Sequence, residues 1–296
     1  MATPISAHTA LLGVLGDPIR HSLSPAMHNA ALAALGLDWV YLALPAAADR
    51  LTAVVQGLDA MGCRGLSVTI PHKQSVAALC RQLSPLAQRL GAVNTLVPMD
   101  GGGWFGTNTD VEGFLAPLRG EPWQGKRAVV LGCGGSARAV VAGLVDLQLS
   151  TITVVGRRAD AREAFAAGCA DWAPQLHTQP WQPGGLGPLL ARADLVVNTT
   201  PAGMASASDP AAAQACPLDA DELQALQASS TAYDLIYVPR PTRFLRQAAD
   251  RGCRSIDGLT MLVHQGAAAL RLWSGRNDVP IDAMTAALEA ALATPT

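Results

Sequence analysis

Short apolar runs alternate with longer, alanine-rich amphipathic stretches along most of the chain. The short runs are rich in Val, Ile and Leu, as buried strands are, and the longer stretches have the spacing and length of helices. Strands that alternate with helices form a parallel sheet covered by helices, so the pattern predicts an α/β fold. In the first half the expected order is strand, helix, strand, helix, strand, at residues 11–16, 24–36, 38–44, 50–62 and 65–70.

The same alternation starts again after a polar, glycine-containing stretch at residues 120–125. The expected strands of this second part, with helices between them, cover residues 126–132, 151–156, 194–200 and 231–237. Apolar residues three and four apart predict two more helices at residues 260–275 and 281–293. The pattern therefore indicates two α/β domains, the second of which resembles a nucleotide-binding half-sheet.

Composition excludes several classes of function. The 296 residues are 50% hydrophobic, enough for two cores, and 21 basic residues nearly balance 23 acidic ones. This balance disfavours nucleic acid or an anionic membrane as partner and favours a small molecule. The six cysteines are widely spaced without a CxxC pair or a neighbouring His cluster, so we expect free thiols and no metal site. The apolar N-terminal stretch is too short and too glycine-rich for a signal peptide or membrane span, and we expect a cytoplasmic protein.

A glycine-rich turn follows the strand expected at residues 126–132 and opens a helix. The first glycine permits a tight turn, the second lets backbone N–H groups approach a pyrophosphate, and a small residue at the third position allows close helix packing. The helix N-terminus would direct its positive dipole end at the phosphate. A plain turn is the alternative, but the strand–loop–helix context favours dinucleotide binding through Gly132, Gly134, Gly135, Ser136 and Ala137.

Two arginines, Arg157 and Arg158, follow the next strand. A site for NAD typically has an acidic residue here that binds the ribose 2′-hydroxyl, whereas guanidinium groups suit a 2′-phosphate. Without the glycine turn upstream, the pair would be interpreted as ordinary solvated arginines. With it, the expected cofactor is NADP.

Polar residues gather at the strand ends of the first half, where α/β sheets bind ligands. The motifs that contain these polar residues make the sequence strongly resemble the shikimate dehydrogenase family, from Gly16 to Gln265. The matching motifs, in chain order, are HSLSP, SVTIPHK, GAVNTLV, NTD, GCGGSARA, NTTPAGM, YDLIY and DGLTMLVHQGA.

The resemblance implies reversible, NADPH-dependent reduction of 3-dehydroshikimate to shikimate, a step towards chorismate and the aromatic amino acids. It also implies a homodimer whose chains have a substrate domain at residues 1–106, a Rossmann-type NADP domain at 107–257, and C-terminal helices at 258–296 that return to the first domain. Lys73 and Asp110 match the catalytic pair. The positions that match substrate-binding residues are Ser22, Ser24, Thr69, Asn94, Asp110, Tyr237 and Gln265. Those that match NADP-binding residues are the glycine turn, Arg157, Arg158, Leu235 and Gly258.

The chemistry of these side chains agrees with the resemblance. When a hydride adds to a carbonyl, negative charge develops on oxygen, and a nearby ammonium such as Lys73 can stabilise it and supply a proton. Asp110 can orient that ammonium together with a substrate hydroxyl. Ser22 and Ser24 flank one residue, so on an extended segment both hydroxyls would point the same way and bracket a carboxylate; Ser24 also suits a helix N-cap.

Two features leave alternatives open. The family commonly has Asn-Arg-Thr where this chain has Gly156-Arg157-Arg158, which weakens the expectation of strict NADP use. Some family members oxidise quinate or use NAD, although Ser24 and the arginine pair favour shikimate and NADP. The remaining alternatives are a non-catalytic NADP-binding regulator of the same fold, which the intact Lys73 and Asp110 disfavour, and a folate-type methylene dehydrogenase.

Overall fold

The computed structural model of the chain describes residues 5–205 and 209–293. It divides into two compact units, of which the first comprises residues 1–113 with 262–296 and the second residues 114–261. Helices α4 (Asp110–Leu115) and α10 (Gly258–Ser274) each carry the chain from one unit to the other. No helix within the described ranges is both long and apolar enough to span a bilayer.

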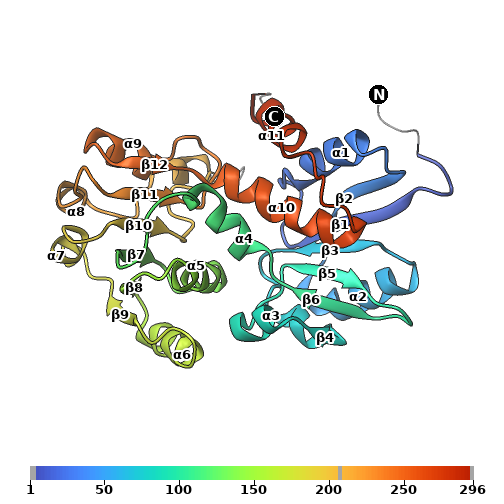
Figure 1. Cartoon of the computed structure of the whole chain (residues 1–296), viewed down its shortest axis with the longest axis horizontal. Coiled ribbons are helices and arrows are strands. Elements are labelled where there is room, and N and C mark those ends of the chain that lie inside the picture. The colour runs from blue at the N-terminus through green and yellow to red at the C-terminus, as the bar shows by residue number, and fades with distance from the viewer. Residues whose placement is uncertain (1–4, 206–208, 294–296) are drawn as a thin grey trace. The chain divides into compact units, whose positions relative to one another are not determined.

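The first unit is built on a six-stranded sheet with strand order β2-β1-β3-β5-β6-β4 (Figure 1). Its first three strands are parallel, as expected, whereas β5 is antiparallel to both β3 and β6. The strands are β1 (Ala10–Gly16), β2 (Trp39–Pro45), β3 (Gly65–Val68), β4 (Gln82–Leu83), β5 (Thr95–Pro98) and β6 (Trp104–Thr107). The helices before α4 are α1 (Ser24–Ala34), η1 (Ala48–Arg50), α2 (Leu51–Ala60), η2 (Ser75–Leu79) and α3 (Pro85–Leu90).

A hairpin at residues 99–103 makes the first sheet mixed. Gly101, Gly102 and Gly103 have φ values of +79°, +86° and +84°, a region that only glycine enters freely. Three such residues in a row reverse the chain tightly, so β6 pairs directly with β5. Residues 99–103, just before the expected domain limit at residue 106, therefore form a hairpin inside the first unit.

Local differences from the expected elements are small. Helix α1 begins at Ser24 itself; the N-cap is Leu23, and no side chain caps the helix, so the expectation of a Ser24 cap was wrong. The backbone at Leu23 is helical rather than extended, with φ −85° and ψ −5°, so the serine pair does not lie on a strand-like segment. Strand β3 ends at Val68, and a turn follows at residues 70–74.

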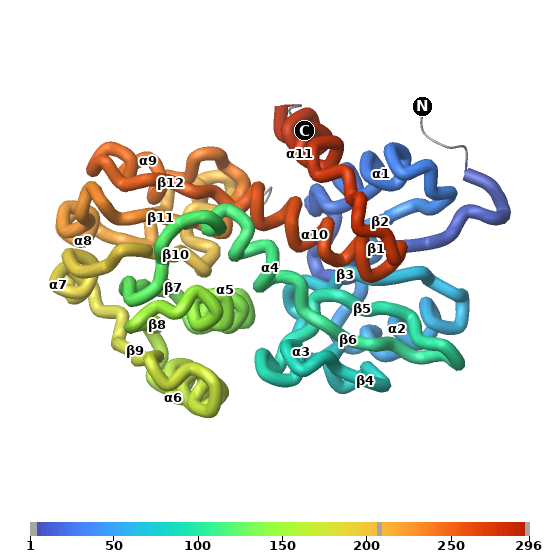
Figure 2. Tube along the Cα trace, in the orientation of Figure 1, coloured from blue at the N-terminus to red at the C-terminus, as the bar shows by residue number. Residues whose placement is uncertain are grey.

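From Leu262 onward, helix α10 and the last helix belong to the first unit. Helix α11 (Ile281–Ala293) packs along α1 (Figure 2). Trp273 on α10 donates its indole N–H to the Leu96 carbonyl at 3.0 Å and lies so close to Gly65 that a Cβ there would come within 2.3 Å of the ring. Gly266 likewise leaves no room for a Cβ against Met27. Close glycine contacts thus fix α10 against the sheet and against α1.

The second unit has an all-parallel six-stranded sheet of order β12-β11-β10-β7-β8-β9, a Rossmann-type arrangement. Its strands are β7 (Arg127–Leu131), β8 (Thr151–Gly156), β9 (Leu176–Pro180), β10 (Leu195–Asn198), β11 (Thr231–Asp234) and β12 (Arg254–Ile256). Its helices are η3 (Ala116–Leu118), α5 (Gly135–Asp146), α6 (Ala159–Cys169), α7 (Gly187–Leu190), η4 (Pro210–Gln214), α8 (Ala220–Gln224) and α9 (Arg243–Asp250). The edge strands β9 and β12 were not expected, because they are short and largely polar. The expected α/β class is confirmed.

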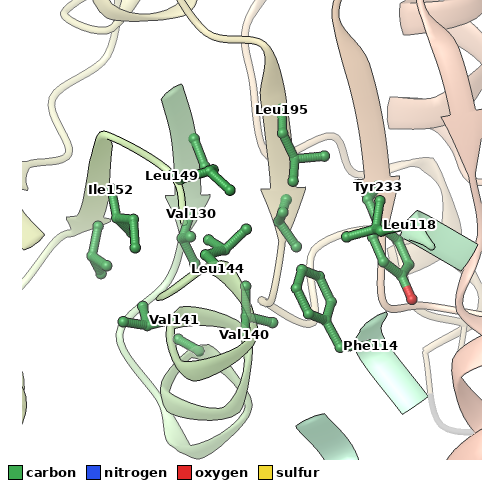
Figure 3. Packing of buried hydrophobic residues seen from close by; sticks show 14 of the residues in the cluster. Phe114, Leu118, Val130, Val140, Val141, Leu144, Leu149, Ile152, Leu195 and Tyr233 are labelled. Carbon is green, nitrogen blue, oxygen red and sulfur yellow. The ribbon is translucent and has the colours of Figure 1, made fainter. Parts of the chain in front are cut away.

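Helix α5 contributes several residues to the core on one face of this sheet (Figure 3). Val140, Val141 and Leu144 point from the helix towards Val130 and Leu195 on the central strands, and all five are buried. Chain order reverses at β7, which has β8 on one side and β10 on the other. Ligands of such sheets bind beyond the carboxyl ends of the strands at this reversal.

Candidate active site and cofactor site

An ion pair joins the two residues expected to handle the proton. The Nζ of Lys73 donates to Oδ2 of Asp110 at 2.6 Å, and their side chains are 19% and 9% exposed. Asp110 lies in the first turn of α4, where the helix dipole stabilises a carboxylate. The pair is thus largely sheltered from water, and Lys73 keeps some exposure.

Asn94 holds the second oxygen of this carboxylate. Its Nδ2 donates to Oδ1 of Asp110 at 2.8 Å and to the hydroxyl of Thr109 at 3.0 Å. Its Oδ1 accepts from the Thr95 hydroxyl and the Thr109 backbone N–H, each at 2.8 Å. Because oxygen and nitrogen both have assigned partners, the amide has one orientation and fixes Asp110. Thr95 and Thr109 were not expected to contribute, although Thr109 lies within the NTD motif.

The backbone on either side of Lys73 is also held. The ring of His72 is 1% exposed, and its Nε2 lies 2.7 Å from the Ala46 carbonyl. The Lys73 carbonyl accepts from the Val93 N–H at 2.8 Å. The side chain of Lys73 therefore projects from an anchored turn.

The other expected substrate residues of the first unit follow strands or lie on helix α10. Ser22 follows β1, and its hydroxyl accepts from the Ser24 N–H at 3.3 Å. Thr69 follows β3 and donates its N–H to the Leu15 carbonyl at 2.9 Å. Gln265, on α10, is half-buried and donates its amide to the Leu262 carbonyl within its own helix. Tyr237 lies in the second unit, after β11.

The glycine turn has the geometry that a phosphate loop needs. Gly132 has φ +104°, and a Cβ there would come within 2.8 Å of the Thr199 hydroxyl. A Cβ at Gly134 or Gly135 would meet nothing within 4 Å, which leaves open space before the first turn of α5. Ala137 is fully buried against the sheet. The first N–H groups of a helix have no intrahelical partner, so this loop fits a pyrophosphate.

Both arginines lie beside this loop. A Cβ on Gly156 would come within 2.8 Å of Cys133 Sγ, so the end of β8 touches the glycine turn. The cysteine fills the space that an asparagine side chain at position 156 would need, which explains the glycine there. Arg157 and Arg158 are exposed, and Arg162, which was not expected to contribute, donates to the carbonyls of Gly156 and Arg157 at 2.9 and 3.2 Å. The exposed guanidinium groups of Arg157 and Arg158 fit a 2′-phosphate next to the loop.

Leu235 and Gly258 meet on the other side of the reversal point. The Leu235 N–H donates to the Asn198 carbonyl at 3.1 Å, and a Cβ on Gly258 would come within 2.0 Å of the Leu235 carbonyl. The expected cofactor residues of the second unit therefore border the carboxyl ends of β7, β8, β10 and β11. A Rossmann-type sheet with this loop, together with a sheltered ammonium–carboxylate pair in the other unit, defines a dinucleotide-dependent oxidoreductase.

Comparisons with known proteins agree. Family models described as "Shikimate dehydrogenase substrate binding domain" and "Shikimate 5'-dehydrogenase C-terminal domain" match residues 14–96 and 258–289. The chain is 48% identical to "Shikimate dehydrogenase (NADP(+))" of Trichormus variabilis, over 96% of this chain and 98% of the relative. It is 50% identical to the protein of the same name from a Synechocystis strain, over 96% of both chains. The chain belongs to the shikimate dehydrogenase family.

Solved structures are similar over almost the whole chain. Shikimate 5-dehydrogenase of Thermus thermophilus, in complex with NADP(H) and shikimate, has a TM-score of 0.82 and 37% identity, covering 96% of this chain and 100% of that one. Quinate dehydrogenase of Corynebacterium glutamicum, in complex with NAD, has a TM-score of 0.84 and 30% identity, covering 95% and 99%. The fold is therefore shared by enzymes of both specificities.

Proposed function

We propose that the protein catalyses the reversible, NADP-dependent interconversion of shikimate and 3-dehydroshikimate. The observation that carries the proposal is the Lys73–Asp110 pair at 2.6 Å, sheltered in the first unit and oriented by Asn94. Relatives about 48% identical over nearly the whole chain are named as NADP-dependent shikimate dehydrogenases, which supports the same substrate and cofactor.

In reduction, NADPH, when bound, supplies the hydride that the carbonyl carbon accepts. The electron pair of the C=O double bond moves to oxygen, and the ammonium of Lys73 donates a proton to it. Asp110 holds the ammonium through Oδ2 and remains an acceptor for a substrate hydroxyl, so it contributes orientation rather than a second proton. In oxidation the neutral amine of Lys73 takes the proton back.

The substrate carboxylate is assigned to Ser22 and Ser24, which bind it through uncharged hydroxyls. The ring hydroxyls are assigned to Thr69, Asn94, Tyr237 and Gln265 besides Asp110. The Nδ2 hydrogens of Asn94 already face Asp110 and Thr109. Besides its assigned substrate contact, Asn94 therefore positions the Asp110 carboxylate. We also propose that the substrate domain ends near residue 106 and that the NADP domain ends near residue 257.

A cytoplasmic homodimer is the assembly we propose. All six cysteines are free thiols, which suits a reducing compartment. Strand β2 lies at the edge of the first sheet and carries the exposed Leu42, so the second copy is proposed to pair along this edge. A small-molecule substrate, rather than nucleic acid or membrane, fits the balanced charge.

The test is the absorbance of reduced nicotinamide after the protein is mixed with shikimate and NADP. Turnover should fall roughly a hundredfold or more in Lys73→Met, since one general acid–base group contributes about 10²–10⁴-fold. The chain has only one other lysine, Lys126, which packs over Trp123 at 5.0 Å, so Lys126→Met is the matched control and should retain activity. Near-normal turnover in Lys73→Met would refute the assignment.

Specificity is tested with shikimate and quinate, each with NADP and NAD. Shikimate with NADP should give the highest kcat/KM. Higher kcat/KM for quinate with NAD would replace the proposed substrate and cofactor. Binding of shikimate without turnover would instead favour a non-catalytic regulator.

A further inference from the structure

A fully buried carboxylate in the second unit has no part in the chemistry proposed above. Asp234 is the last residue of β11 and is 0% exposed. Burying a carboxylate costs several kcal/mol unless donors replace its water. Three uncharged donors do so: Asn198 Nδ2 and the Ile236 N–H reach Oδ1 at 3.0 and 3.1 Å, and the Thr242 hydroxyl reaches Oδ2 at 2.7 Å.

The first donor ties Asp234 to the loop that touches the glycine turn. Asn198 ends β10, and its Oδ1 accepts from the N–H and the hydroxyl of Thr200 at 3.0 and 2.7 Å. Its Nδ2 also approaches the Ala202 carbonyl at 3.3 Å. A Cβ on Gly132 would come within 2.9 Å of Thr200 Cγ2, so the loop after β10 packs directly against the glycine turn.

The other two donors tie Asp234 to the segment after β11. The Ile236 N–H fixes the backbone next to Leu235, whose carbonyl lies against Gly258. Thr242 is the N-cap of α9 and so determines where that segment ends. One carboxylate therefore joins both loops that border the reversal point on the β10–β11 side.

We propose that Asp234 is a positioning residue for the dinucleotide: its carboxylate holds the loops after β10 and β11 in their cofactor-binding arrangement, so that NADPH affinity depends on its ionisation. This inference rests on the proposed function, because it requires the cofactor to bind this sheet. The residue acts through Asn198, Ile236 and Thr242 and does not touch the cofactor.

The surroundings of Asp234 make this ionisation sensitive to pH. Burial raises the pKa of Asp234 to about 6, against the opposing effect of its three hydrogen-bond donors. The charge of Asp257, which pairs with Arg240 at 2.6 Å, raises the pKa of Asp234 further. The charge of Asp234 in turn raises the pKa of the neighbouring Cys216 thiol. Below pH 6 the carboxyl becomes neutral, so the hydrogen bonds that hold the two loops are no longer charge-assisted and become weaker. By linkage, a ligand that needs both loops ordered binds best to the ionised form.

The experiment measures NADPH binding by nicotinamide fluorescence between pH 5 and 8, in the wild-type chain and in Asp234→Asn. Asparagine keeps the shape, can accept from Asn198 and Ile236, can donate to Thr242, and does not titrate. The NADPH 2′-phosphate, which titrates near pH 6, affects both proteins equally. Between pH 8 and pH 5 the Kd of the wild type should rise at least about fivefold more than that of Asp234→Asn, the lower end of typical coupling factors.

A second pair of variants tests the direction of the effect. Thr242→Val removes one donor to the carboxylate and should move the midpoint of the Kd profile up by roughly one pH unit. Thr242→Ser keeps the hydroxyl and should leave the midpoint in place. Thermal unfolding at each pH checks that every variant is folded under the conditions of the titration.

The outcomes separate this inference from the proposed function. Superimposable profiles of the wild type and Asp234→Asn, or an unmoved midpoint in Thr242→Val, would overturn the role of Asp234. Failure of the wild type to bind NADPH at pH 8 would overturn it as well. Pronounced pH-dependent NADPH binding without oxidation of shikimate would leave the role of Asp234 standing and refute only the proposed reaction.

Discussion

His28 should make the protein sensitive to acid in a way that can be calculated. The residue lies on α1, is 1% exposed, and stacks on Tyr41 with ring centroids 4.2 Å apart. The ring centroid of Trp273 lies 5.4 Å from that of His28. Neither nitrogen of the His28 ring has a hydrogen-bond partner among the described residues. An imidazolium here would be a buried charge without compensation. Burial accordingly lowers the pKa of His28 from 6.5 to about 3.

The sign of the pH dependence follows from proton binding. Between pH 6.5 and pH 3 the unfolded chain binds a proton at His28 that the folded chain excludes, so the free energy of unfolding falls as the pH falls. One pKa unit corresponds to about 1.4 kcal/mol. The pKa of His28 in the unfolded chain, 6.5, lies about 1.5 units above a solution pH of 5. Acidification from pH 7 to pH 5 should therefore cost about 2 kcal/mol of stability through His28 alone.

The assay is urea unfolding at pH 7, 6 and 5, followed by circular dichroism, with His28→Phe as the variant. Phenylalanine keeps an aromatic ring on Tyr41 and cannot take up a proton. The loss of stability between pH 7 and pH 5 should be about 2 kcal/mol smaller in the variant, whatever its absolute stability. His177→Gln, at an exposed position on β9, is the control and should follow the wild type. Equal losses in the wild type and His28→Phe would refute the reasoning.

Three further predictions concern the two sites. Thr109→Val leaves one Nδ2 hydrogen of Asn94 without its acceptor, so it should lower the free energy of unfolding by about 1–3 kcal/mol and reduce kcat. Thr109→Ser keeps the hydroxyl and should retain both values, as measured by chemical unfolding and steady-state kinetics. Gly132→Ala should lower stability and NADPH affinity together, whereas Gly134→Ala, which meets no protein atom within 4 Å, should lower affinity alone; thermal unfolding and fluorescence titration distinguish them. Arg157→Ser should raise the KM for NADP more than that for NAD, and equal effects would exclude a 2′-phosphate contact.

The alternation of apolar strands and amphipathic helices was enough to predict the α/β class and most strands. Such periodicity is a local property, because each element must bury one face whatever its neighbours are. It did not predict β4, β5 or β6, because these short strands depend on the hairpin at residues 99–103 and on pairing with β3 and with one another. The short polar strands β9 and β12 were missed for the same reason: they are stabilised by the parallel neighbours against which they pair.

Motifs in the sequence identified the residue types of both sites. The glycine turn, the arginine pair, Lys73 and Asp110 could all be named in advance, since each has a characteristic neighbourhood in the chain. Their partners could not. Nothing near Asn94 in sequence indicates that Thr109 and Asp110 use its two Nδ2 hydrogens.

The sequence by itself determined the class of fold, the family and the chemical groups available for hydride transfer, because these depend on short-range patterns and on residue identity. Only the tertiary structure decided which groups hold one another: Asn94 against Asp110, Cys133 against Gly156, and Asp234 against the loops after two strands. Contacts of this kind join residues up to dozens of positions apart and act over about 3 Å, so they exist only once sheet register and helix packing have brought the backbones together.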